Sequence, residues 1–318
     1  MNYSLFKLQF QTAVHFGLYD SALSLHSSGD HFYADTLFSA LCHMAGDLWG
    51  DAGVRQLCGY VFDGKLRLSD SMPWCADRLY LPKPFVHAES RNEVPAQLRK
   101  QIKKLAWIEI GAFSQFADSL HGGGIFQPRQ VKFGSDDEQT RVSLHSDPPT
   151  PYQVGTYQFR SDCGLYFIAG CENDEVETCL TKLVEVLAFS GIGGKTSSGL
   201  GRFEFLKTPV KDSADQQLKW LHNALGNDHA PGQLLLTTSL PTDDELDRAM
   251  EGASFQMIRR GGFANASGDT FYKKQTQYFL TAGSLLRSRF DGALYQVGNS
   301  GSHPIFRYAV PIFLGVCL

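Results

Sequence analysis

The sequence predicts an α+β fold in two domains, residues 1–207 and 208–318. In the first domain, strand-like alternation and helix-like spacing of apolar residues follow one another as strand, helix, strands and helix. The succession strand, helix, strand, strand returns in the second domain. A glycine-rich stretch, Gly191–Arg202, separates the last helix of the first domain from its last strand. Hydrophobic content of 43% over 318 residues is enough to bury a core in each domain.

The first domain is predicted to begin with a strand at 1–11, where apolar and polar residues alternate. A helix follows at 34–49, with Asp35 close to its positive end. Short strand signals broken by prolines fill 59–86, and 95–108 is predicted to form a second helix.

The middle of the chain mixes glycine-rich, polar and strand-like segments. Glycines follow one another in His121–Phe126, where a tight turn is one explanation. Residues 134–151 are polar, acidic and contain proline, which predicts a mobile loop. Strands are predicted at 157–159 and 165–169.

The helix that leads into the glycine-rich stretch is marked by its cap and by its apolar face. Asn173 is a suitable N-cap, and apolar residues then recur at helical spacing. These residues are Val176, Leu180, Leu183, Val184 and Leu187. Beyond the glycines, Arg202–Phe205 alternates like a half-buried strand, so the order is helix, loop, strand.

The second domain is predicted to open with a linker helix at 214–225. Its further elements are a strand at 234–240, a helix at 243–250, strands from about 255 to 263, at 273–280 and at 292–297, and a final strand at 309–316.

The glycine-rich loop combines five glycines with cations and hydroxyl groups. Glycine permits φ > 0, and successive N–H groups in such a loop can form an anion-binding nest. A helix C-cap and turn would need only one or two glycines. A nucleotide P-loop is excluded, because its order is strand, loop, helix and Phe189 stands where its first glycine is required. The predicted phosphate-binding residues are Gly191, Gly193, Gly194, Lys195, Thr196, Ser197, Ser198, Gly199, Gly201 and Arg202.

A glycine loop between the last helix and last strand of an α+β unit resembles the RAMP superfamily of CRISPR proteins, and Gly193–Phe203 is similar to its glycine-rich loop. Residues 15–17 and Ala34–Leu41 resemble the start of one family within it, the fourth Csm subunits of type III-A CRISPR complexes. The C-terminal part of that family is matched by Arg259-Arg-Gly-Gly, Lys273-Lys, Ala282-Gly-Ser and His303–Tyr308.

This resemblance implies two ferredoxin-like (RRM-like) RAMP domains. It also implies a non-catalytic subunit of a Csm interference complex in antiviral defence. Such a subunit would bind the 5′ repeat-derived tag of crRNA and dock the large signature subunit and the backbone RAMP subunits. In RAMP proteins an insertion can form a thumb-like hairpin, which makes Phe126 a candidate wedge between bases. The alternative is a RAMP-type endoribonuclease that processes CRISPR repeat RNA.

Charge is distributed unevenly along the chain. The net charge is −4, yet from Gly252 onward seven Arg or Lys stand against two Asp. A basic third in an acidic protein predicts an RNA-facing surface, although solvated cations are the simpler explanation for any single residue. The predicted RNA-binding residues here are Arg259, Arg260, Lys273, Lys274, His303 and Arg307, with Tyr308 and His303 as candidates for base stacking.

No catalytic residue is predicted. His15, His26 and His31 lie where a general base of a processing enzyme would be, but no oriented partner is evident from the sequence. Asp30 and Asp35 flank the loop before the first helix, and a backbone subunit can carry a target-cleaving aspartate there; Asp35 is more simply explained as a helix-start acid.

Neither a metal site nor a cofactor is predicted. The seven cysteines form no CxxC pair, which predicts reduced, mostly buried thiols in a cytoplasmic protein. The N-terminus starts directly with a strand and no apolar run is long enough to span a bilayer, so neither a signal peptide nor a membrane segment is expected.

Overall fold

The computed structural model of the chain describes residues 1–17, 25–86, 95–143, 148–265, 271–299 and 303–318. Its α-helices are α1 (Ala34–Phe62), α2 (Ala96–Lys104), α3 (Phe113–Leu120), α4 (Asp174–Ser190), α5 (Gln216–Gly226) and α6 (Asp243–Met250), with 3₁₀ turns at Ile110–Ala112 and Thr196–Ser198.

The first two thirds of the chain contain eleven of the described strands, and seven of these share one sheet. The eleven strands are β1 (Asn2–Phe10), β2 (Phe16–Gly17), β3 (Ser28–Gly29), β4 (Leu66–Leu68), β5 (Met72–Cys75), β6 (Arg78–Pro82), β7 (Trp107–Glu109), β8 (Gly134–Ser143), β9 (Thr150–Phe159), β10 (Cys163–Cys171) and β11 (Phe203–Pro209). The last third contributes shorter strands. They are β12 (Gly232–Leu235), β13 (Met257–Arg260), β14 (Phe263–Asn265), β15 (Phe271–Lys273), β16 (Gln277–Leu280), β17 (Leu285–Leu286), β18 (Leu294–Asn299), β19 (Pro304–Tyr308) and β20 (Phe313–Val316).

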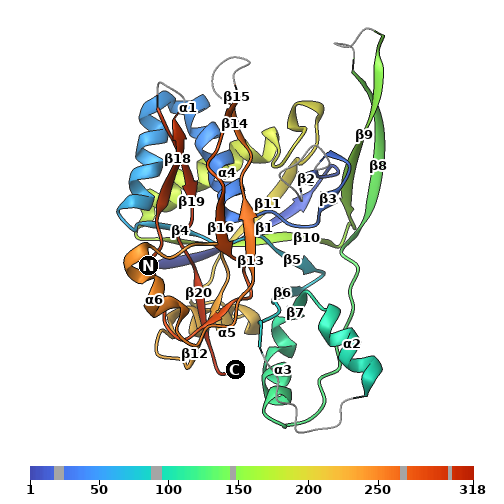
Figure 1. Cartoon of the computed structure of the whole chain (residues 1–318), viewed down its shortest axis with the longest axis vertical. Coiled ribbons are helices and arrows are strands. Elements are labelled where there is room, and N and C mark those ends of the chain that lie inside the picture. Colours follow the sequence, from blue (N-terminus) through green and yellow to red (C-terminus); the bar gives the residue numbers. More distant parts are fainter. Residues whose placement is uncertain (18–24, 87–94, 144–147, 266–270, 300–302) are drawn as a thin grey trace.

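A seven-stranded antiparallel sheet forms the centre of the molecule (Figure 1). Its order is β11-β1-β10-β5-β6-β7, with β4 also paired to β10. Apolar side chains of β1 and β10 pack on one face against α1 and α4, and on the other face against α5, β12 and β20. The prediction of a mixed α+β fold is confirmed, and the sheets are antiparallel.

Sequence patterns that span only a few residues correctly predicted the positions of several helices. The Asn173 side chain accepts a hydrogen bond from the Val176 N–H at 3.1 Å and caps α4, whose five predicted apolar residues are buried. Helix α6 has the predicted bounds. The predicted end of the first helix at 49 coincides with a break in α1, where Gly50 takes φ +63° before helical structure resumes.

Other predictions were wrong. Residues 134–151 do not form a mobile loop: β8 and β9 pair over ten residues each and project from the body as a long hairpin (Figure 1), apart from 144–147, which lie outside the described residues. The predicted helix at 95–108 ends at Lys104, because Trp107–Glu109 pairs with β6. Phe126 is no exposed wedge, since its ring is buried against Phe116.

The last third is divided among small sheets. Strands β17, β12 and β20 form one, while β18 pairs with β19. Strand β13 pairs with β16 and β14 with β15, and these four strands make one long hairpin that we call the ribbon. The described parts of the two predicted domains share a core, because Leu5 and Tyr166 pack in the same cluster as Leu234 and Leu314. Strand β11 also continues to Pro209, past the proposed boundary at 207, and the division into domains stays a prediction.

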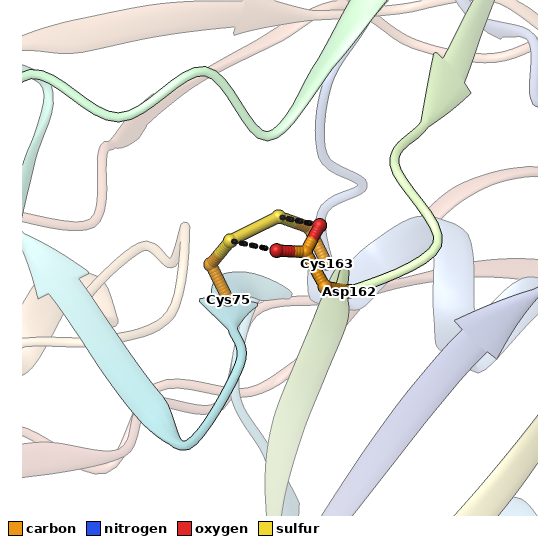
Figure 2. A group of neighbouring side chains, drawn as sticks. All are labelled: Cys75, Asp162 and Cys163. Atoms are coloured by element: carbon orange, nitrogen blue, oxygen red, sulfur yellow. Dashed lines mark hydrogen bonds between the residues drawn. A yellow bond between two sulfur atoms is a disulfide. The ribbon is translucent and has the colours of Figure 1, made fainter.

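The expectation of reduced thiols throughout was wrong for one pair. Cys75 of β5 and Cys163 of β10 lie opposite each other in register and form a disulfide (Figure 2). The other five cysteines are free. Within the described residues, no helix has the length and apolar character needed to cross a membrane.

Asp70 joins three separate parts of the chain. Its carboxylate is buried and accepts hydrogen bonds from the N–H of Ala34 at 2.8 Å, the N–H of Thr238 at 2.9 Å and the hydroxyl of Thr238 at 2.6 Å. It therefore satisfies one of the open N–H groups at the start of α1 and fixes the segment that follows β12.

Replacing Asp70 by alanine should lower the free energy of unfolding by roughly 2–4 kcal/mol, because two buried N–H groups lose their acceptor. Urea denaturation followed by far-UV circular dichroism measures this. Asp228→Ala is the matched control, since that side chain is 62% exposed. Equal midpoints for the two variants would show that Asp70 does not hold these segments.

Asp70 should also make stability depend on pH. Burial raises its pKa to about 6, although the hydrogen bonds from Thr238 and Ala34 act in the opposite direction. Between roughly pH 4 and pH 6 the folded chain keeps a proton that the unfolded chain has lost, so stability falls as pH rises through this window. Relative to Asp70→Asn, which cannot titrate, the free energy of unfolding of the wild type should fall by up to about 3 kcal/mol from pH 4 to pH 7. A difference independent of pH would contradict this.

Candidate nucleic-acid interface

The glycine-rich loop is held against the segment that follows β1. Gly191 ends α4 with φ +88°, the Gly194 N–H donates to the His15 carbonyl at 2.8 Å, and the Gly201 N–H donates to the Ala13 carbonyl at 2.9 Å. A Cβ at Gly193 would lie 2.7 Å from the His15 oxygen, and one at Gly194 would lie 2.6 Å from the His15 ring. The glycines are thus required for close packing as well as for backbone freedom.

Most N–H groups of the loop are already used, contrary to the prediction that they face a ligand. Those of Gly191, Ile192, Gly194, Ser198, Gly199, Gly201 and Arg202 donate to acceptors of the chain itself. In the described part of the chain no acceptor is found for the N–H groups of Lys195, Thr196 and Ser197, which follow one another. The N–H groups of Gly193 and Leu200 likewise have no acceptor among the described residues, so backbone contacts to a phosphate are limited to these five positions of the loop.

The side chains of the loop remain accessible. Lys195 has a left-handed backbone with φ +62°, and its ammonium lies 5.2 Å from the centre of the Tyr152 ring on the β8–β9 hairpin. Arg202, Ser197 and Ser198 are exposed, and Thr196 is half-buried. The loop thus presents two cations and three hydroxyl groups to solvent.

A groove of about 310 Å³ opens between the start of α1, the glycine-rich loop and the ribbon. It brings together four of the predicted RNA-binding residues from distant parts of the sequence, Gly193, Arg260, Lys274 and Arg307. The remaining lining residues are Asp35, Thr36, Ser39, Ala40, His43, Gly261 and Phe306.

Asp35 organises the cations of this groove. Arg260 binds its carboxylate with two nitrogens, Nε at 3.0 Å and Nη2 at 2.8 Å, and Arg307 Nε lies 3.9 Å away. Burial alone would raise the pKa of Asp35, but the charge and hydrogen bonds of Arg260, followed by Arg307 and Lys274, lower it. Asp35 is in the first turn of α1, as predicted, and its carboxylate stays ionised at neutral pH.

Arg260 and Arg307 are consequently not the exposed cations that the sequence suggested. The side chain of Arg307 is 3% exposed, and it donates to the carbonyl groups of Arg260, Gln275 and Gly261. The Arg260 guanidinium also lies over the Tyr33 ring at 4.5 Å. Both residues give the groove its charge while their hydrogen-bonding groups hold the ribbon against α1.

The groove nevertheless has an excess of positive charge. Among the described residues that line it, three are cations, Arg260, Arg307 and Lys274, and one is a carboxylate, Asp35, so the formal charge of this lining is +2. Burial, together with the two guanidinium groups, lowers the pKa of Lys274 more than Asp35 raises it. An anion entering the groove would relieve this imbalance, and phosphate is the anion that such a set of donors recognises.

The other predicted residues of the basic third lie elsewhere. Arg259, Lys273 and His303 are exposed and do not line the groove. Tyr308 was wrongly proposed to stack on bases, because its ring is fully buried against Phe38 and its hydroxyl accepts from the Leu68 N–H at 2.7 Å.

The three histidines considered for catalysis differ in their surroundings. His15 is buried, its Nδ1 lies 2.6 Å from the Gly155 carbonyl of β9, and its own carbonyl accepts the Gly194 N–H of the glycine-rich loop. His26 is exposed. His31 has a partner that the sequence analysis overlooked: its Nδ1 lies 2.8 Å from Asp30 Oδ1. Burial would raise the pKa of Asp30, but the hydrogen bond and charge of His31 lower it.

A metal site is not evident among the described residues. The only group of His, Cys, Asp or Glu found close enough to share an ion in that part of the chain is Cys75, Asp162 and Cys163. Figure 2 shows its two sulfur atoms joined in the disulfide, which removes the thiolates that a metal would need.

Sequence reasoning missed the contribution of α1 to the groove. Thr36, Ser39 and His43 line it from one side of the helix. Their spacing of three and four residues places them on one face, opposite the buried residues Leu37, Leu41 and Ala45. The polar side of that helix was the available signal.

Comparison with known proteins agrees with this architecture. Residues 228–316 match the family described as the CRISPR Csm4 C-terminal domain. Two solved structures share the fold over 99% of this chain: the Csm3–Csm4 subcomplex of a type III-A CRISPR-Cas interference complex (TM-score 0.67, 16% identity, 99% of that chain) and a Csm1–Csm4 cassette in complex with cA4 (TM-score 0.61, 18% identity, 98% of that chain).

Two relatives align with nearly the whole length of this chain. A protein of Mycobacterium tuberculosis named CRISPR system Cms protein Csm4 is 32% identical over 321 residues, covering 99% of this chain and 98% of its own. The protein of the same name from Streptococcus thermophilus is 32% identical over 323 residues, covering 98% of both chains. At this identity and coverage, the chain belongs to the Csm4 family of CRISPR Csm complexes.

Proposed function

We propose that this chain is a non-catalytic RNA-binding subunit of a type III-A CRISPR complex and that it holds the 5′ repeat-derived tag of crRNA. The observation that carries this proposal is the +2 groove between α1, the glycine-rich loop and the ribbon. Half-buried Lys195 and exposed Arg202 lie on the same loop as Gly193, so a phosphate backbone can follow the loop into the groove.

The topology supports a ferredoxin-like description of the first two thirds. The elements follow as β1, α1, β4 and β5, β10, α4 and β11, and the four positions of the sheet are ordered β11-β1-β10-β5. The last strand thus lies at the edge beside the first. For the final third we retain the reduced ferredoxin-like description as a proposal, although β12 and β13 lie in different small sheets.

The proposed assembly partners are the large signature subunit and the backbone RAMP subunits. The solved structures that share this fold are described as pairs with Csm1 and with Csm3, which supports the proposal. In this role the chain contributes binding surfaces to antiviral defence, and no chemical step is required of it.

A second function, that of a repeat-processing endoribonuclease, is favoured by one observation. His31 is oriented by the Asp30 carboxylate, and their side chains are 27% and 39% exposed. A histidine held in this way is the arrangement that a general base requires. His31 does not line the groove, and this separation from the proposed RNA site is why we prefer the non-catalytic role.

Loss of cations at the loop and groove should weaken RNA binding and reduce its dependence on salt. For a single-stranded RNA with the tag sequence, Lys195→Ala/Arg202→Ala should flatten the slope of log K against log salt by about 1.4, and Lys274→Ala by about 0.7. Electrophoretic shift titrations at several salt concentrations measure both slopes. Lys100→Ala, an exposed cation on α2, is the control and should leave the slope unchanged. If these variants fold and keep the wild-type slope, the substituted residues do not contact the RNA.

The purified chain should leave an end-labelled repeat RNA intact, with or without Mg²⁺, because His31, the histidine held by a carboxylate, does not line the proposed RNA groove, and the Asp35 carboxylate in the groove is bound by Arg260. The sharpest check compares wild type, His31→Ala and His15→Ala on a denaturing gel. Specific cleavage that disappears in His31→Ala and persists in a conservative control such as Asp228→Ala would establish the endoribonuclease instead.

A further inference from the structure

Two sulfur atoms and a carboxylate meet at one end of the pairing between β5 and β10. Cys75 ends β5 and Cys163 begins β10, and the two residues lie opposite each other in the register. Asp162 directly precedes Cys163, and its carboxylate points to both sulfur atoms (Figure 2). Asp162 Oδ2 lies 3.9 Å from the sulfur of Cys75, and Oδ1 lies 3.5 Å from the sulfur of Cys163. The proposed RNA site does not use this cluster.

The position of the carboxylate does not depend on the bond between the sulfur atoms. The Ala76 N–H donates to the Asp162 carbonyl at 2.6 Å, and the Cys163 N–H donates to the Arg160 carbonyl at 3.0 Å. The Arg160 guanidinium holds the carboxylate itself, through Nε to Oδ1 at 3.1 Å and Nη2 to Oδ2 at 3.0 Å. Ligating carboxylates in metal sites are oriented by hydrogen-bond donors of this kind.

Reduction of the disulfide turns the cluster into a set of three metal ligands. A dithiol reductant supplies two electrons: the bond between the two sulfur atoms breaks, Cys75 and Cys163 each become a thiol, and the reductant becomes a disulfide. The thiolate is the form of cysteine that binds a metal, and it exists only after this step.

The spacing of the donor atoms fits a tetrahedral zinc ion. With Zn–S bonds of about 2.3 Å and Zn–O bonds of about 2.0–2.2 Å, tetrahedral ligands lie about 3.6 Å apart for sulfur and oxygen and about 3.8 Å apart for two sulfurs. The two sulfur–oxygen distances of 3.9 and 3.5 Å lie on either side of the first value. Only the two sulfur atoms have to separate, and reduction releases them to do so. Thiolate ligands select zinc over magnesium and calcium, which prefer oxygen.

The charges of the reduced cluster also call for a divalent cation. Two thiolates and the Asp162 carboxylate carry three negative charges, and Arg160 supplies one positive charge, so the sum is −2. Like charges placed this close repel one another unless a cation compensates them. The Asp162 side chain is 46% exposed, whereas Cys75 and Cys163 are buried, so an ion can enter past the carboxylate.

We propose that the reduced chain binds Zn²⁺ through the sulfur atoms of Cys75 and Cys163 and the carboxylate of Asp162, with water as the fourth ligand. Strands β5 and β10 are then joined by a covalent bond when the cysteines are oxidised and through the metal ion when they are reduced. Binding of Zn²⁺ displaces the protons of the thiols, so the affinity falls as the pH is lowered.

The test compares Zn²⁺ binding by the oxidised and the reduced full-length chain. The chain is reduced with dithiothreitol, freed of it under nitrogen and titrated with Zn²⁺ against a chromophoric chelator. The reduced wild type should bind one equivalent that the oxidised wild type does not bind. Co²⁺ in place of Zn²⁺ should give thiolate-to-cobalt charge-transfer absorption in the near ultraviolet.

Three variants assign the ligands. Cys75→Ser should abolish binding of this equivalent. Asp162→Asn keeps both thiols and should weaken the Kd for Zn²⁺ at least tenfold, because a charged ligand is lost. Cys317→Ser removes an exposed free thiol outside the cluster, so it is the matched control and should bind Zn²⁺ as the wild type does.

The outcomes that overturn the proposal are distinct from a failure of RNA binding. If the reduced wild type is folded by circular dichroism and binds no more Zn²⁺ than the oxidised form, the site does not exist. The same holds if Asp162→Asn, or a folded Cys75→Ser, keeps the wild-type affinity. If a thiol-reactive dye shows that the disulfide opens only when the chain unfolds, the folded protein has no thiolates to offer and the proposal is also overturned.

Discussion

The contact between the Asp35 carboxylate and the Arg260 guanidinium sets the distance between α1 and the ribbon. Asp35 opens the first long helix, whereas Arg260 comes 225 residues later, and their two hydrogen bonds of 3.0 and 2.8 Å fix both the separation and the orientation of these elements. Arg307 then completes the cluster from β19. Removing a buried carboxylate that compensates guanidinium groups costs on the order of 3–5 kcal/mol, because the remaining charges are left uncompensated. The walls of the groove depend on this pair.

The same cluster explains how an acidic protein contains a positive site. The chain as a whole has a net charge of −4, but a single carboxylate serves three cations in the groove. Carbonyl groups hold Arg307 in place without neutralising it. Positive potential is therefore generated by arranging a few partly buried charges rather than by covering a surface with lysine and arginine.

Sequence patterns identified the elements whose signals are local. The Asn173 cap, the buried face of α4 and the bounds of α6 all depend on residues within a few positions of one another. The β8–β9 hairpin was missed because most of β8 is exposed on both faces, so its sequence has no apolar alternation. The glycine-rich loop was located correctly, but most of its N–H groups bond to the chain, which depends on the distant segment around His15.

The candidate site was predicted only in part, because it too depends on contacts between distant parts of the chain. Composition drew attention to the cations of the last third, three of which line the groove, yet composition cannot tell Arg259 from Arg260. That distinction depends on which face of the ribbon meets α1, and on a carboxylate from the other end of the chain. Tyr308 illustrates the same limit, because an aromatic residue suited to stacking was needed for the core.

The central position of β1 has a consequence for how the protein is made. This strand is the first to leave the ribosome, but its neighbours in the sheet are β10 and β11, whose residues are synthesised last among those of the main sheet. At roughly 5–20 residues per second, about 10–40 s pass before β11 is complete. Until β10 has been synthesised, Phe6, Leu8 and Phe10, all buried in the finished protein, have no strand to pair with on either side. During synthesis, the apolar side chains of β1 must therefore be kept from associating with other chains until β10 and β11 are available to pair with it.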